Sequence, residues 1–354
     1  MSIETSSIKL SVHLVTWNGV RYLPYLFDSL RAQPYKDWEL FVWDNDSQDE
    51  TPLVLRGLLA DFPVPHHATF HKDNIGFAGG HNRLFFHAGS SEYFLLLNQD
   101  MYLDPLCFER LVSFLDKNQK AAAVSPRLMR WDFPVVETNG IEKSLTNVVD
   151  ALGLKIFRSR RVIEQYTKYH WNELSSSFSD RVLPVFGVSG ALPMFRRSAI
   201  ESVQFTPDQF LDETYHSYKE DVDLAYRLFS AGYHSYVLLD VVSHHDRSGA
   251  GPKGLDDRGA AKNKREQSSW VKYHSYKNHL RTLWKNMYWQ NILLDFPFII
   301  WYEIKKCIWF ILFDRAVLRG FFELFSGRKD IKEKRKAIIK TRTRSWRDIR
   351  RWWK

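Results

Sequence analysis

The fold is decided by KLSVHLVTW (residues 9–17), RYLPYLFDSLRA (21–32), WELFVWDN (38–45) and TPLVLRGLLADF (51–62). The first and third segments are short and apolar, with β-branched and aromatic residues, which favours strands. The second and fourth place apolar residues at helical spacing. Alternating strands and helices with nearly continuous apolar strands are typical of a parallel sheet covered on both faces. We therefore predict an α/β fold with a mostly parallel central sheet.

The alternation continues along the chain. Residues 138–180 have no clean period and are interpreted as an insertion that covers the site. LPVFGVSGALPMFRRSAI (183–200) is interpreted as one strand that turns at Gly190 and enters a helix. Further elements are expected as a strand near ATFHK (68–72), a helix from about Ala78 to Ala88, a strand YFLLLN (93–98), a helix opening at Pro105, a strand AAAVSP (121–126), and a helix and strand within 218–245.

Composition limits the kinds of function that the chain can have. Cys107 and Cys307 have no CxxC partner, which argues against a disulfide framework or a cysteine-ligated zinc site and fits a reducing compartment. The N-terminal sequence lacks a secretion signal, so we expect a cytoplasmic protein. Of the formal charge of +9, residues 326–354 contribute +10, from 13 Lys and Arg against three acids. The remaining chain is close to neutral, and we expect no nucleic-acid partner.

Polar residues follow the predicted strands where ligands bind in such sheets, beyond the carboxyl ends. Thr16 and Asn18 follow the first strand, and WDNDSQDET (43–51) ends the second. A carboxylate there can accept a hydrogen bond from the imide N–H of uracil or thymine. The alternative is an Asx-rich turn in which Ser47 or Asp49 caps the next helix.

Two further segments have the chemistry of a diphosphate site. NIGFAGGHN (74–82) has three glycines that let the backbone approach a ligand at a helix start, although a plain glycine-rich turn is an equal alternative. LLLNQDMYLDP (95–105) places Asn98 and Asp100 on one side of the chain. Oxygen ligands of this kind suit Mg²⁺ or Mn²⁺ on a diphosphate; the alternative is a strand-to-turn cap.

Carboxylates and histidines occur again near residue 220 and near residue 244. In YKEDVDLAYRLFSAGY (218–233), Glu220 or Asp221 begins the predicted helix, either as a cap or as a general base for a sugar hydroxyl. In SHHDRS (243–248), adjacent histidines point to opposite faces of a strand, so at most one can bind a metal at a given site; the alternative is a structural histidine.

In their order along the chain, VTWN, WDNDSQDE, NIGFAGGHN, LLLNQD, GVSGALPMFRR, KEDVDLAYRLFSAGY and VVSHH resemble glycosyltransferase family 2, in its rhamnosyltransferase-like branch, over about residues 8–250. The resemblance implies a nucleotide-binding fold of the A type, inversion at the anomeric carbon and a divalent metal (Mg or Mn). NQD stands in place of the family's DxD motif, with Asn98 as the departure. The residues it implies are Asp221 as base; Asp100 and His244 (with His245 as the alternative) for metal; Gly190, Ala191 and Glu220 beside the acceptor; and Thr16, Asn18, Asp44, Asn45, Asn74, Gly76, Phe77, Gly79, Gly80, Asn82, Asn98 and Gln99 for the donor.

The branch implies transfer of L-rhamnose from dTDP-L-rhamnose to a hydroxyl of a lipid-linked or cell-surface polysaccharide intermediate. Another dTDP or UDP sugar is the alternative, with a glycan or glycolipid as acceptor. The rival of a different class is a non-catalytic scaffold for glycan assembly, against which EDVD, Asp100 and His244 argue. A sugar-nucleotidyltransferase would need a basic, glycine-rich phosphate motif at the first strand, which VTWNGVRYL does not supply.

The chain divides into a catalytic domain (1–250), a mobile loop (251–269) and a helical, aromatic and basic appendage (270–354). The apolar run at 292–313 contains too many charges for a spanning helix and suits an interfacial one. We expect peripheral association with an anionic membrane at the inner face, helped by the basic tail. The alternatives are a helical bundle packed on the catalytic domain and, more weakly, nucleic-acid binding through the tail.

Overall fold

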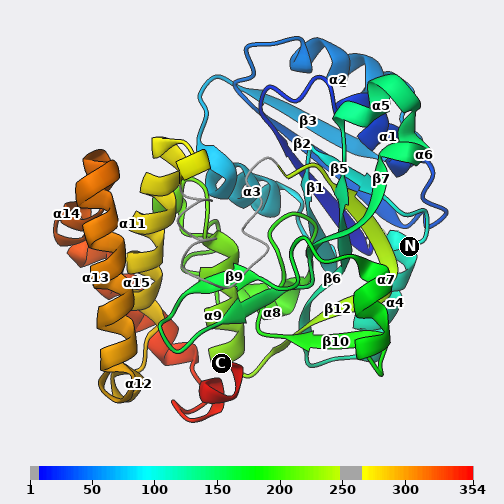
Figure 1. Ribbon diagram of the computed structural model, residues 1–354. Coiled ribbons are helices and arrows are strands. Elements are labelled where there is room, and N and C mark those ends of the chain that lie inside the picture. The colour runs from blue at the N-terminus through cyan, green and yellow to red at the C-terminus, as the bar shows by residue number, and fades with distance from the viewer. Residues whose placement is uncertain (1–7, 248–264, 354) are drawn as a thin grey trace, which may run out of the picture.

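The computed structural model describes residues 8–247 and 265–353, so most of the predicted mobile loop lies outside the described residues. An α/β unit and a group of C-terminal helices stand side by side (Figure 1). The first half of the chain forms β1 (Leu10–Thr16), α1 (Leu23–Arg31), β2 (Trp38–Asn45), α2 (Thr51–Ala60), β3 (His66–His71), α3 (Gly76–His87), β4 (Tyr93–Asn98), β5 (Met101–Leu103), α4 (Cys107–Lys117) and β6 (Ala121–Trp131).

The second half of the α/β unit contains α5 (Pro134–Asn139), α6 (Ile141–Ser144), β7 (Leu145–Ala151), β8 (Leu154–Ile156), β9 (Val162–Glu164), α7 (Trp171–Leu174), η1 (Ser175–Ser177), β10 (Val182–Val185), β11 (Met194–Arg196), α8 (Arg197–Glu201), η2 (Glu213–Tyr215), α9 (Glu220–Ser230) and β12 (His234–His245). The main sheet has the order β10-β12-β6-β11-β4-β1-β2-β3, with β5 on β12 and β7 on β6.

The sheet confirms the predicted architecture. Strands β3, β2, β1 and β4 are paired in parallel, as are β6 and β12. One apolar core joins the sheet to α1, α2 and α4, and a second joins it to α3, α8 and α9. Helices therefore cover both faces, which explains why the strands are apolar along most of their length.

One element prediction is wrong. Residues 183–200 form two strands at separate places in the sheet, not one strand that turns at Gly190. β10 pairs with β12 at the sheet edge, whereas β11 lies antiparallel between β4 and β6. The loop between these two strands carries Gly190, which is thereby brought to the N-terminus of α9.

The C-terminal residues form α11 (Ser269–Asn286), α12 (Trp289–Leu294), α13 (Phe296–Phe313), η3 (Arg315–Leu318), α14 (Arg319–Ser326), α15 (Arg328–Thr341) and η4 (Asp348–Trp352). Within the described residues, none of the helices combines the length and the apolar character that a membrane span requires. Figure 1 shows α11 between α9 and the outer helices.

Buried ion pairs fasten these helices to the α/β unit. Asp212 lies between Lys285 of α11, at 2.5 Å, and Lys334 of α15, at 2.7 Å. Burial alone would raise the pKa of Asp212, but the two ammonium groups hold it far below its usual value. A buried charge is tolerated only when it is paired. The predicted appendage is thus a bundle packed on the catalytic domain, the arrangement that we considered as an alternative.

Part of the basic tail makes internal hydrogen bonds. Arg335 donates to the carbonyl oxygens of Trp284 and Met287, which satisfies acceptors at the C-terminal end of α11. Arg344 donates to the carbonyl oxygen of Gly232. Arg350 lies 3.0 Å from the buried carboxylate of Asp295. These side chains hold the tail on the protein, and that part of the charge is half-buried.

Candidate active site

The carboxyl ends of β1 and β2 are joined through their polar side chains. Thr16 and Asp44 are in register, and the Thr16 hydroxyl donates to the carboxylate at 3.1 Å. The same carboxylate accepts from the hydroxyl and the N–H of Ser47. Asp44 is buried and organises an Asx-type turn beyond β2, so the turn that we weighed against nucleotide binding is present.

Two amide side chains fix the conformation of the loop after β1. Asn18 has a φ of +48° and accepts at 2.8 Å from the N–H of Gln48, which ties this loop to the one after β2. Gln99 accepts from the N–H of Trp17 at 2.9 Å and donates to its carbonyl at 3.1 Å. Its amide therefore positions the backbone of the loop, a role different from the predicted donor contact.

The glycines of α3 allow close packing. Gly80 lies against Val15, since a Cβ at Gly80 would be 3.0 Å from that side chain. Gly76 has a φ of +77°, and a Cβ there would come within 2.5 Å of the carbonyl oxygen of His216. Gly79 abuts Ile75 in the same way. A plain turn and tight helix packing thus account for these three positions, which we predicted to line the donor pocket.

Three asparagines brace this region. Asn45 donates to the carbonyl of Gly76 at 3.1 Å, and Asn74 accepts from the Gly76 N–H at 2.9 Å. Asn82 is fully buried, and its amide bonds the backbone of Phe210 and Leu211. Its predicted contact with the donor is corrected to a structural link, because burial leaves no surface for a ligand. Phe77 packs edge-on against His81, with ring centroids 4.3 Å apart.

At the ends of β4 and β12, Asp100 and His245 meet. His245 Nε2 lies 3.2 Å from Asp100 Oδ1, and its Nδ1 lies 3.0 Å from Asp150 Oδ2. Burial alone would lower the pKa of His245, but the charges and hydrogen bonds of the two carboxylates raise it to about 9. His245 is thus a charged imidazole between two carboxylates. A carboxylate on one nitrogen is also the usual support of a histidine whose other nitrogen binds a metal.

The choice of His244 as the metal ligand is corrected by the register of β12. His244 pairs with Met129 and Tyr102, and His245 with Arg130 and Met101. Successive side chains of a strand alternate between faces, so only His245 is directed to Asp100. Burial lowers the pKa of His244 to about 4. That environment suits a neutral structural histidine.

The contacts of Asp100 and His245 extend into a larger cluster of charged side chains. Its further members are Asp150, Arg247 and Glu164. Arg247 Nε lies 3.4 Å from Asp150 Oδ2, and its terminal nitrogen lies 3.3 Å from Glu164 Oε1 and 3.0 Å from Ser189 Oγ. Burial raises the pKa of Glu164, while the charge of Arg247 opposes that rise. The insertion predicted to cover the site thus contributes two carboxylates to it, Asp150 from β7 and Glu164 from β9.

Asp221 stands in the first turn of α9 beside this cluster. Its Oδ2 accepts from the N–H of Gly190 at 3.3 Å, and its Oδ1 accepts from the N–H of Val222 at 2.7 Å. A Cβ at Gly190 would lie 3.6 Å from that of Asp221, which places the 190 loop directly against the base candidate. Ala191 is buried, and its carbonyl accepts from the Asn98 N–H of β4. The carboxylate of Asp221 is partly exposed.

Glu220 differs from its neighbour. It is 5% exposed, and burial raises its pKa to about 8. A carboxyl in that environment is largely protonated at neutral pH and has lost most of its contact with solvent. We predicted that Glu220 lies beside the acceptor. Its side chain is instead buried.

The segment before Asp221 is strained and held by α11. His216, Tyr218 and Lys219 have φ values of 63°, 73° and 74°, in the left-handed region. The amide nitrogen of Asn278 lies within 2.7 to 3.0 Å of the carbonyl oxygens of Tyr215, Ser217 and Tyr218. Strain of this kind persists only where surrounding contacts enforce it. The C-terminal bundle thus fixes the backbone that presents Asp221.

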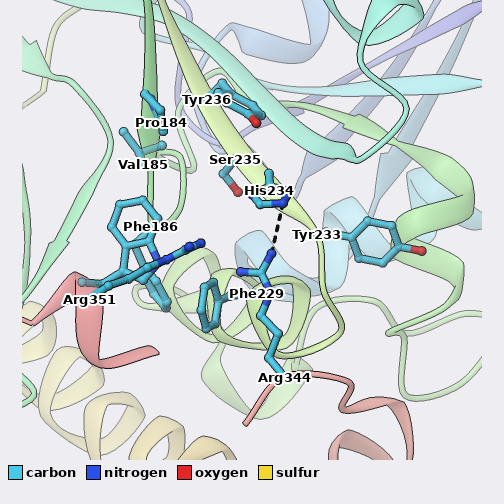
Figure 2. Close-up of a pocket in the computed structure, with 11 residues that line it drawn as sticks. Pro184, Val185, Phe186, Phe229, Tyr233, His234, Ser235, Tyr236, Arg344 and Arg351 are labelled. Carbon is cyan, nitrogen blue, oxygen red and sulfur yellow. Dashed lines mark hydrogen bonds between the residues drawn. The ribbon is translucent and has the colours of Figure 1, made fainter. Parts of the chain in front are cut away.

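A cavity of about 380 Å³ lies elsewhere, at the opposite end of β12 from His245. Figure 2 shows Arg344 of the tail directed at His234. A nitrogen of its guanidinium lies 3.2 Å from His234 Nε2, and Arg351 lies over the rings of Phe229 and Trp352. The tail and the start of β12 form the walls of this cavity, which is therefore distinct from the cluster of Asp100, His245, Asp150, Arg247 and Glu164. Its lining comprises Pro184, Val185, Phe186, Phe229, Tyr233, His234, Ser235, Tyr236, Arg344, Arg351 and Trp352.

Asp100 and His245 fit a divalent cation with the help of substrate phosphates. Among the described residues, no cluster of three or more His, Cys, Asp or Glu side chains surrounds a single point. Mg²⁺ and related ions are often held by one or two carboxylates together with substrate phosphates and water. One carboxylate (Asp100) and one imidazole (His245), with Asp150 on the other nitrogen of that imidazole, are suitable ligands for a cation that also binds substrate phosphates.

Three members of the cluster escaped the sequence analysis: Asp150, Glu164 and Arg247. Asp150 follows two valines near the end of β7, a strand-end carboxylate of the kind sought elsewhere. Glu164 and Arg247 carry no local signal, because their partners are distant in sequence. Arg247 follows β12 by two residues, and its side chain is packed among carboxylates.

Comparison with known proteins gives the family and the fold. Residues 11–203 match glycosyl transferase family 2. EpsE of Bacillus subtilis (strain 168), which is described as a glycosyltransferase, is 28% identical over 127 residues, 36% of this chain and 45% of that relative. The match thus spans less than half of the relative's length.

Two solved structures share the fold at 13% identity. GalNAc-T7 with UDP, GalNAc and Mn²⁺ superposes with a TM-score of 0.56, over 79% of this chain and 48% of that one. The mannosyltransferase PcManGT from Pyrobaculum calidifontis, in complex with GDP-Man and Mn²⁺, superposes with a TM-score of 0.51, over 94% and 86%. The family match, which covers more than half of the chain, confirms the predicted family and class of enzyme: the chain belongs to glycosyl transferase family 2.

Proposed function

We propose that the protein is an inverting glycosyltransferase that moves L-rhamnose from dTDP-L-rhamnose to a hydroxyl of a lipid-linked or cell-surface polysaccharide intermediate. The observation that carries transfer with inversion is the placement of Asp221. One partly exposed carboxylate stands at the start of α9, beside a cluster that joins it to Asp100 and His245. The identity of the sugar rests on the resemblance of the motifs to the rhamnosyltransferase-like branch.

In the proposed reaction, Asp221 accepts the proton of the acceptor hydroxyl. The hydroxyl oxygen then forms a bond to the anomeric carbon as the bond from that carbon to the diphosphate breaks on the opposite side, which inverts the configuration. Gly190 N–H and Val222 N–H hold the carboxylate in place for this step. A single base meets the requirement, because no covalent sugar intermediate is formed.

Asp100 and His245 would hold the divalent cation, with Asp150 orienting the imidazole through its other nitrogen. When bound, such a cation supplies positive charge that stabilises the departing diphosphate. Arg247 places a second positive charge in the same cluster, where it balances Asp150 and Glu164. We propose that its guanidinium keeps these carboxylates from repelling the diphosphate.

His245→Ala is expected to lower the Mn²⁺-dependent affinity for dTDP or UDP by about 10- to 100-fold, since it removes a ligand and its support from Asp150. Asp100→Ala should do the same. His244→Ala is the matched control and should bind as the wild type does, because its side chain is directed to the other face of β12. Titration calorimetry with Mn²⁺ or with a chelator measures the effect. Equal nucleotide binding in both conditions would contradict the metal role.

A thermal-shift screen of nucleotide sugars tests the donor. A ligand at about 100 times its Kd stabilises the native state by about 2.7 kcal/mol, which corresponds to several degrees in Tm. We expect dTDP-L-rhamnose with Mn²⁺ to give the largest shift, ahead of UDP sugars and GDP-mannose. A larger shift with another donor would replace rhamnose in the proposal. The absence of a shift with any of these donors would favour a non-catalytic role.

We also propose that the enzyme works at the cytoplasmic face of a membrane. A lipid-linked acceptor is confined to that surface, so a protein that stays there meets its substrate at a high local concentration. The apolar C-terminal helices and the remaining basic residues of the tail support this location.

A further inference from the structure

Helix α13 exposes many of its apolar side chains and buries part of its charge. Ile300, Ile304, Ile308 and Ile311 follow each other at helical spacing and are 40%, 42%, 51% and 43% exposed. On the opposite side, Lys306 is buried and pairs with Glu303, which lies 2.8 Å from His279 of α11. A surface helix of a globular protein shows the reverse pattern, with its apolar stripe facing the core. The outer side of α13 is therefore suited to an apolar environment.

Neighbouring helices extend this surface. On α12, Trp289 and Leu293 are more than half exposed, as is Phe322 on α14. Figure 1 shows α13 and α14 on the side of the molecule turned away from the sheet. We define the apolar face as the exposed large apolar side chains of α12 to α14: Trp289, Ile292, Leu293, Leu294, Phe296, Phe298, Ile300, Trp301, Ile304, Ile308, Ile311, Leu312, Phe313, Phe321, Phe322 and Phe325.

So many adjacent apolar side chains are not accounted for by the scatter of single hydrophobic residues on a soluble surface. Large contiguous apolar patches mark sites of protein or membrane interaction. Each large side chain that leaves water contributes about 1.5–3 kcal/mol. The apolar face therefore supplies a strong driving force for association with whatever covers it.

The charged residues around the apolar face indicate which kind of partner covers it. Between residues 289 and 325 the acidic residues are Asp295, Glu303, Asp314 and Glu323. The first three are buried or half-buried and paired with basic groups, and the exposed Glu323 accepts a hydrogen bond from the Tyr273 hydroxyl. The other exposed charges at the border are basic: Arg315 and Arg319, followed by the start of α15. A surface on which exposed cations outnumber exposed carboxylates is complementary to anionic lipid headgroups. Exposed tryptophans suit the level of the headgroups.

We propose that the apolar face binds an anionic lipid bilayer, with α12 to α14 lying in the plane of the headgroups. The inference deepens the proposed function by naming the surface that meets the membrane, and it rests on that function only for the choice of a membrane-bound acceptor. No described helix is suited to cross the bilayer, so the contact is interfacial. The basic tail has a smaller part than the sequence predicts, because Arg335, Arg344 and Arg350 are bound internally.

Point substitutions test binding of the apolar face to lipid better than removal of the C-terminal helices does, because truncation would leave Asp212 buried without its lysines. The double variant Ile304→Glu/Ile308→Glu places two charges on the exposed stripe of α13. Leu53→Glu is the matched control, since Leu53 is 70% exposed on α2, far from α13. Flotation would use vesicles of phosphatidylglycerol and phosphatidylcholine in equal amounts, and of phosphatidylcholine alone.

The full chain and Leu53→Glu should float with the anionic vesicles, and the double variant should lose at least about tenfold in binding, since two apolar side chains no longer enter the interface. A wild type that stays unbound, or a double variant that floats equally well, would overturn the inference. Self-association measured by ultracentrifugation and abolished by the double variant, without any flotation, would assign the face to a second copy and also overturn it.

The donor-induced Tm shift separates this inference from the proposed function. The double variant should keep the wild-type shift, because the substituted side chains are exposed and lie outside the catalytic cluster. Loss of flotation with an unchanged shift therefore reports on the lipid surface alone. A chain that floats but responds to no nucleotide sugar would contradict the transferase proposal and leave the lipid surface supported.

Discussion

Asp221→Asn is expected to lower the rate of sugar transfer by about 10²- to 10⁴-fold, the usual contribution of a positioned general base. The amide has nearly the same shape, but it cannot accept the proton of the acceptor hydroxyl. Nucleotide and metal binding should persist, because the proposed function assigns them to other residues, Asp44 and Asp100. Steady-state kinetics with a hydroxyl acceptor, together with calorimetry for the nucleotide, measures both quantities.

Glu220→Gln provides the contrast within the same helix turn. Burial raises the pKa of Glu220 to about 8, so its carboxyl is mostly neutral at pH 7 and resembles the amide that replaces it. We expect a far smaller loss of rate than for Asp221→Asn. Full activity of Asp221→Asn, or a larger loss in Glu220→Gln, would contradict the assignment of the base.

Asp212→Ala is expected to lower the free energy of unfolding by about 3–5 kcal/mol, because the substitution leaves charges buried without their partner. Lys285 would keep only Asp223, at 3.1 Å, and Lys334 only the half-buried Asp330. Urea denaturation at neutral pH measures the change. Since the pKa of Asp212 is depressed in the native state, its contribution is present above the unfolded pKa and is lost as pH falls through the folded one.

Asp240→Ala is the matched control for this prediction. Asp240 pairs with Arg110 at 3.0 Å, but both side chains are more than a third exposed. An exposed pair contributes at most about 1 kcal/mol. Equal destabilisation by the two substitutions would show that the buried network does not hold the C-terminal helices. Because Asn278 of α11 also positions the segment before Asp221, the stability of the bundle and the rate of transfer are expected to fall together.

Local sequence determined the α/β architecture and the family. Strands such as YFLLLN are apolar throughout, which is possible only where helices cover both faces of a sheet. Thr16 lies at the end of β1 and Asp44 near the end of β2, and Asp100 follows β4 by two residues; parallel strands bring such ends together at one edge. A continuous apolar run and the identity of a strand-end residue are properties of short segments, so they can be read without the fold.

Tertiary structure decided which of these residues face one another. His245, and not His244, faces Asp100 because register, set by pairing with β5 and β6, fixes the face of each side chain. Glu164 and Arg247 entered the cluster through partners more than 80 positions away along the chain. Likewise, charges on the C-terminal helices that sequence assigns to solvent or lipid are buried in ion pairs, while isoleucines of α13 are exposed. Burial depends on the elements that pack around a residue, and no local pattern contains them.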